Sequence, residues 1–172
     1  MISECIWSGL IGTFIGIISS FGITLLKAHF ETSACIKAID TEIRSLNSIC
    51  ENVFDNVITD DDSILNYEYP LGTDYFTIFN ANSSNIGKIS DNKKRELIVS
   101  IYITAKYFLD CIRTNNHCLD EFKKIDEKYN DKNTVQYKED IKFAMENLKH
   151  SKVNNILPAY KKLKTLLGLY LS

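Results

Sequence analysis

The sequence has few residues that interrupt a helix. Its 172 residues include only two prolines and seven glycines, and four of those glycines lie within the first 22 positions. Proline and glycine are the residues least compatible with a helix interior. Their scarcity after residue 22 therefore favours long helices and argues against a fold made of many tight turns.

The sequence also lacks the motifs that mark common catalytic sites. It contains no glycine-rich phosphate loop, no His-Glu-x-x-His and no Gly-x-Ser-x-Gly. Cys111, His117 and Cys118 form its only near-cluster, but a structural zinc site usually takes four ligands from paired short spacings. A Cys-His nucleophile pair is equally weakly supported, because no orienting group is evident. We therefore expect no enzyme activity, no metal and no cofactor.

Net charge and cysteine usage exclude further classes. The formal net charge of -2 argues against a generally basic nucleic-acid binder, so direct sequence-specific binding is not expected. The five cysteines fit no disulfide framework and indicate free thiols in a reducing cytoplasm. Basic clusters are interpreted as solvated helix faces. For Lys161, Lys162 and Lys164, beside an apolar C-terminal turn, contact with anionic lipid or with nucleic acid is the alternative.

One long uncharged run stands near the N-terminus. Residues 5–26 contain no charged side chain and are bounded by Glu4 and Lys27. A helix of this length rises about 33 Å, enough to cross a hydrocarbon core of about 30 Å. The sequence therefore predicts a transmembrane anchor over residues 1–27. A buried core helix and a cleaved signal peptide are the alternatives, although the signal peptide would need a basic start.

The residues flanking this run predict its orientation. No Lys or Arg precedes the run, whereas Lys27, Lys37 and Arg44 follow it. The positive-inside rule then places a C-terminal domain, residues 28–172, in the cytoplasm. The expected localisation is single-pass in a bacterial inner membrane, with membrane lipid as a partner.

Small residues recur along one face of the predicted anchor. Such a face lets a second helix approach closely, as in GxxxG pairs. We interpret it as a helix–helix contact within a homo-oligomer; the alternative is that small residues are simply tolerated there. The face consists of Ser8, Gly12, Gly16, Ser20 and Thr24.

A regular apolar seam follows in residues 28–58, where no glycine or proline occurs. Its members are spaced alternately by three and four residues, which is typical of a helix with one apolar face. We expect this stalk helix to pack on the later helices of the chain, with pairing to a second copy as the alternative. The seam consists of Ile36, Ile39, Ile43, Leu46, Cys50, Val53 and Val57.

The remaining sequence predicts two more long helices. An aromatic-rich connection, 59–90, holds one short helix at about 74–80 with Thr73 as its N-cap. A helix over 91–129 is capped by Asp91 and weakened at Asn115-Asn116, and a helix over 134–170 is bent at Pro158. The fold class is therefore all-α: a transmembrane helix continuing into a stalk that packs with two further long helices in an antiparallel bundle.

Part of the sequence resembles a known group of proteins. The shared positions are Ile86-Gly87-Lys88-Ile89, then Arg95, Ile98, Val99, Tyr102 and Lys106, and then Asn115-Asn116. They resemble small bacterial membrane-anchored helical proteins of anti-phage loci, including the transmembrane effectors of retron systems. The resemblance implies abortive infection, in which a protein or ribonucleoprotein partner restrains an effector until phage is sensed.

Two functions follow as expectations. The first is an anti-phage effector that oligomerises in the inner membrane and perturbs it when its partner releases it. The second is a membrane-tethered adaptor or scaffold that recruits a cytoplasmic partner and does no damage to the membrane. The small-residue face and the lack of catalytic motifs favour the first.

Overall fold

The computed structural model describes residues 2–58, 63–72 and 75–172, with side chains from residue 19 onward within these ranges. The described residues form helices and no strands, which confirms the all-α class. The elements are α1 (Ile2–Ile49), a π-helical turn η1 (Cys50–Phe54), α2 (Thr77–Ile86), α3 (Asn92–Lys128), α4 (Val135–Ser151), a second π-helical turn η2 (Lys152–Ile156) and α5 (Leu157–Leu171).

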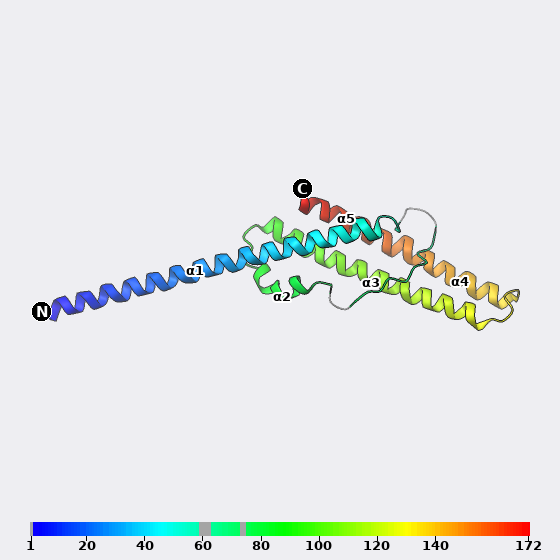
Figure 1. Ribbon diagram of the computed structural model, residues 1–172, viewed down its shortest axis with the longest axis horizontal. Helices are drawn as coiled ribbons and strands as arrows, with labels where there is room; N and C mark the ends of the chain where they lie inside the picture. The colour runs from blue at the N-terminus through cyan, green and yellow to red at the C-terminus, as the bar shows by residue number, and fades with distance from the viewer. Residues whose placement is uncertain (1, 59–62, 73–74) are drawn as a thin grey trace.

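The four long helices α1, α3, α4 and α5 pack together, and the shorter α2 packs against α1. Helix α3 contacts both α4 and α5, and α1 contacts α2 and α5 (Figure 1). Each long helix contributes apolar side chains with little or no exposed surface. They include Ile39 and Ile43 from α1, Ile98, Ile101, Phe108 and Ile112 from α3, Leu148 from α4, and Leu163 and Leu167 from α5.

Helix α1 extends well beyond this bundle. Its N-terminal part points away from the other helices as an unaccompanied rod (Figure 1). The change is visible in burial: Cys35 and Ile39 are buried, whereas Phe21, Leu25 and Phe30 are exposed. The other helices thus pack against α1 from about Cys35 onward.

The predicted localisation is corrected by the structure. Within the described ranges, no helix is long and apolar enough to cross a membrane, which contradicts a single-pass inner-membrane protein with a cytoplasmic domain. Residues 5–18 of the predicted anchor lie outside the residues whose side chains are described. Among the residues whose side chains are described, the uncharged positions 19–26 are followed by Lys27, His29 and Glu31. A crossing needs about 20 predominantly apolar residues.

The helix boundaries follow local signals in most places. The Asp91 carboxylate accepts from the Lys94 N–H at 3.0 Å, which confirms it as the N-cap of α3. Residues 134–170 do not form one regular helix, because η2 separates α4 from α5. Pro158 lies in the first turn of α5, directly after η2, where the helix carries its π-helical turn.

The connection between α1 and α3 differs from its prediction. The short helix predicted at 74–80 is α2, which begins at Thr77 and ends at Ile86. Thr73 and Asp74, like the acidic turn 59–62, lie outside the described residues. Phe76 occupies the N-cap position of α2, and its side chain accepts no hydrogen bond.

Candidate binding cleft

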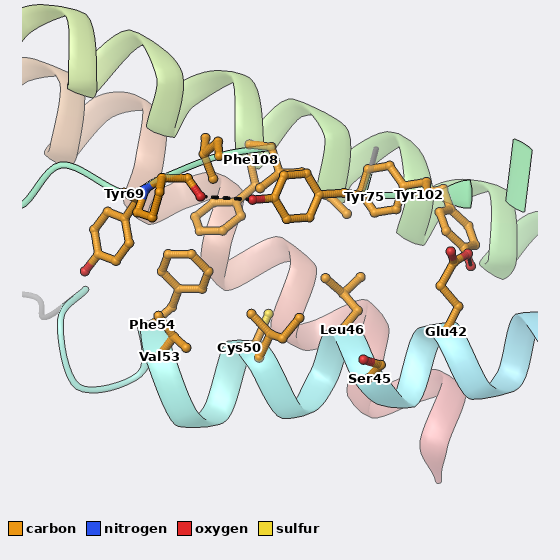
Figure 2. Close-up of a pocket in the computed structure, with 16 residues that line it drawn as sticks. Glu42, Ser45, Leu46, Cys50, Val53, Phe54, Tyr69, Tyr75, Tyr102 and Phe108 are labelled. Carbon is orange, nitrogen blue, oxygen red and sulfur yellow. Dashed lines mark hydrogen bonds between the residues drawn. The ribbon is translucent and has the colours of Figure 1, made fainter. Parts of the chain in front are cut away.

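An apolar cleft of about 260 Å³ lies between α1 and α3, closed on one side by the connection that precedes α2. Figure 2 shows side chains from α1 rising toward Tyr75, Tyr102 and Phe108. The lining residues come from three segments: Glu42, Ser45, Leu46, Ile49, Cys50, Val53 and Phe54; Tyr69, Pro70, Leu71, Tyr75 and Phe76; and Tyr102, Ala105, Phe108 and Leu109.

The α1 wall of the cleft results from helical spacing. Leu46, Cys50 and Phe54 are four residues apart, so they lie on one face. In the predicted stalk seam, Ile39, Ile43 and Cys50 are buried and Ile36 and Leu46 partly buried, whereas Val53 and Val57 are 40% and 36% exposed. Val53 lies with Ile49 (41% exposed) at the mouth of the cleft, where apolar side chains face solvent.

Glu42 organises one end of the cleft. Its carboxylate accepts hydrogen bonds from the backbone N–H groups of Ile78 and Phe79, each at 3.0 Å, and from the hydroxyl of Tyr102. The first N–H groups of a helix have no partner within the helix and favour a negative charge. Glu42, from α1, therefore caps α2, whose described N-cap residue Phe76 makes no side-chain hydrogen bond of its own.

Replacing Glu42 with glutamine is expected to lower the free energy of unfolding by about 1.5–3 kcal/mol, the usual contribution of hydrogen bonds to a charged group. The amide cannot accept from all three donors without turning its own N–H₂ toward one of them. Urea denaturation followed by circular dichroism measures the change. Glu139→Gln, at an exposed position of α4, makes the same change of charge and is the control. An equal loss in both variants would contradict the capping role.

Two asparagines hold the connection against α3. Asn116 donates to the carbonyl of Tyr69 at 2.7 Å and accepts from its N–H at 3.2 Å, while Asn115 donates to the carbonyl of Leu65 at 3.0 Å. The sequence predicts a weak point at these asparagines, but α3 runs through them without a break. The hydrogen bonds of Asn115 and Asn116 place the Tyr69 ring against Phe54, with ring centroids 5.3 Å apart.

The chemistry of the cleft favours binding over reaction. Burial raises the pKa of the Cys50 thiol to about 12, so this thiol stays protonated and is a poor nucleophile. Burial, followed by the hydrogen bond to Glu42, also raises the pKa of Tyr102 well above its usual range. The Glu42 carboxylate is already occupied by three donors. The surface that the cleft leaves available to a ligand is apolar and partly aromatic.

The residues singled out by the sequence are only partly brought together here. Several members of the stalk seam line the cleft, but Ser20 and Thr24 lie on the protruding part of α1, where the Thr24 hydroxyl donates to the Ser20 carbonyl at 2.9 Å. Ser8, Gly12 and Gly16 lie outside the described side chains. The cleft itself was missed; the density of aromatic residues between 67 and 79 was its one signal in the sequence.

The near-cluster on α3 does not form a ligand set. Cys111 is buried, while the His117 imidazole faces solvent 3.6 Å from the Glu121 carboxylate. Across the part of the chain that the structure describes, no three or more His, Cys, Asp or Glu side chains are grouped to hold a metal ion.

No protein family, no curated protein and no solved structure matches this chain. The resemblance to anti-phage membrane effectors therefore stays a prediction made from the sequence.

Proposed function

We propose that this protein is a non-catalytic interaction module that binds an apolar helical segment of a protein in the cleft between α1 and α3. The observation that carries the proposal is the cleft itself, with its apolar lining and the solvent-facing Ile49 and Val53 at its mouth. Exposed apolar surface beside a concave site is a common mark of protein interaction.

The size of the cleft is compatible with protein side chains as its ligand. Its volume is about 260 Å³. A cleft of this size takes one or two apolar side chains. The rest of the ligand must then lie outside, against the mouth.

The shape of the mouth favours a helix as the ligand. Ile49, Val53 and Val57 form an exposed apolar strip at four-residue spacing, at the end of α1, in η1 and in the turn that follows η1. An amphipathic helix laid in such a groove presents anchors at i, i+3 and i+7. One anchor would enter the cleft while its neighbours cover the strip.

Of the two functions expected from the sequence, this proposal develops the adaptor. It does not include the membrane tether. The effector needs a spanning helix, so it is not carried forward. An anti-phage setting, a ribonucleoprotein partner and the antiparallel order of the helices remain predictions, and the absence of enzyme activity is part of the proposal.

A neutral probe peptide tests this function. A fluorescein-labelled helix of about 16 residues, with Leu, Leu and Phe at i, i+3 and i+7 and Ala and Gln elsewhere, should bind saturably by fluorescence polarisation. Ile49→Glu with Val53→Glu should weaken binding by at least about tenfold, because a charge would be desolvated at the mouth. Ile103→Glu with Phe143→Glu, at two apolar positions that are each 65% exposed on α3 and α4, is the matched control. Equal binding by the mouth variant, or no binding by the wild type, sinks the proposal.

A further inference from the structure

The part of α1 that projects from the bundle carries an unaccompanied apolar face. We call residues 19–30 the protruding segment. Ile23, Leu26 and Phe30 are 66%, 59% and 68% exposed, and they occur at i, i+3 and i+7, on one side of the helix. Phe21 and Leu25 are exposed on the opposite side. Exposed large apolar side chains gathered on a projecting helix are a common mark of an interaction surface.

The protruding segment has the anchor spacing that the cleft favours. Phe30 is an aromatic anchor of the kind that packs edge-on against rings such as Tyr75 and Phe76, which line the cleft. The charges are also compatible. Lys27 is the only Lys or Arg before Lys37, and Glu42 is the only carboxylate among the residues that line the cleft.

The segment cannot reach the cleft of its own chain. Both belong to α1, one continuous helix from Ile2 to Ile49. At 1.5 Å per residue, Phe30 lies about 18 Å along this helix from Glu42, and Ile23 lies about 28 Å from it. Bringing them together would require breaking α1. A second copy of the chain can bring its own segment to the cleft without any such change.

We propose that the protruding segment of one copy docks in the α1–α3 cleft of a second copy, so that the chain assembles head to tail. This inference rests on the proposed function and names its partner. The two contacting surfaces differ, so the contact is heterologous. Each addition leaves one free segment and one free cleft, and the assembly grows into a ring or an open chain.

Two full-length variants, each lacking one surface, test the inference. The segment variant carries Ile23→Glu and Phe30→Glu, and the mouth variant carries Ile49→Glu and Val53→Glu. Light scattering coupled to size exclusion should give a concentration-dependent mass for the wild type, and each variant alone should stay at the 19.7 kDa of one chain. Mixed in equal amounts, the variants should form a complex of twice that mass and no larger, because each supplies the surface that the other lacks.

The control and the contrary outcomes are specific. Ile103→Glu with Phe143→Glu changes two apolar residues that are each 65% exposed elsewhere, and it should assemble like the wild type. Self-association by either single-surface variant, or a mixture that stays monomeric, overturns the inference. Sedimentation with phosphatidylcholine vesicles that only the segment variant loses also overturns it, since lipid would then cover the segment. A monomeric wild type that binds the probe peptide leaves the proposed function standing, whereas failure of the probe peptide removes both.

Discussion

Replacing Phe108 with alanine is expected to lower the free energy of unfolding by about 3–5 kcal/mol, the usual cost of emptying a buried aromatic site. Phe108 is only 2% exposed, and its ring centroid lies 5.0 Å from that of Phe54 and 5.4 Å from that of Tyr160. These rings come from η1, α3 and α5, so no single helix can shift to fill the space. The total free energy of unfolding of an ordinary domain is about 5–15 kcal/mol, so this loss is a large part of it.

The measurement is urea denaturation followed by helical circular dichroism. Phe143→Ala removes the same side chain from an exposed site on α4 and should change stability by about 0.5 kcal/mol or less. Phe108→Leu keeps most of the apolar volume and should fall between the two. Equal losses at Phe108 and Phe143 would show that the ring cluster does not contribute to stability as described.

A steep loss of stability above pH 10 is expected from Tyr102 and Tyr160. Burial raises the pKa of both hydroxyls, and each also donates to a carboxylate: Tyr102 to Glu42, and Tyr160 to Asp55 at 2.6 Å. In the unfolded chain a tyrosine loses its proton near pH 10, whereas in the fold these two keep theirs. The native state then binds more protons than the unfolded state, so stability falls as pH rises, by up to about 1.4 kcal/mol per pH unit for each residue.

Substitution by phenylalanine isolates this effect. The variant with Tyr102→Phe and Tyr160→Phe loses hydrogen bonds and should be less stable at pH 7, but its stability should fall less steeply between pH 10 and pH 11. Tyr67→Phe, at a 59% exposed site, is the control and should keep the wild-type slope. An unchanged slope in the double variant would contradict the assignment. The Cys50 thiol, whose pKa is raised to about 12, contributes in the same direction in all three proteins.

The sequence predicted the helices well where the signals are local. The scarcity of proline and glycine predicted long helices, and the start of α3 follows from Asp91 as a cap. These features depend on residues within one turn of each other. Most of the all-helical fold could therefore be predicted before any tertiary contact was known.

The register of α1 could not be predicted from spacing alone. A heptad places Cys50, Val53 and Val57 on one seam, but the buried residues after Cys50 are Phe54 and Ile58. The reason is η1, where the Asp55 N–H donates to the Cys50 carbonyl at 3.0 Å, five residues back. A π-helical turn holds more residues per turn than an α-helix, so it rotates the buried face by about one residue. That rotation leaves Val53 at the mouth of the cleft.

The candidate cleft itself depends on contacts between distant residues. Glu42 and Ile78 are 36 positions apart, and Asn116 and Tyr69 are 47 apart. Neither pair has a local signature, because any exposed glutamate or asparagine looks the same in sequence. The aromatic residues of the connection indicated packing, but not which helices they would lie between.

The position of the α2 cap on another helix has a consequence for the order of folding. Among the described residues, the side-chain acceptor of the Ile78 and Phe79 N–H groups is Glu42 of α1, so α2 gains this stabilisation only when α1 lies beside it. The long helices can form from contacts near in sequence, whereas the connection must wait for Glu42 and Asn116 to be in place. The side that closes the cleft therefore depends on both α1 and α3 being in place beside it.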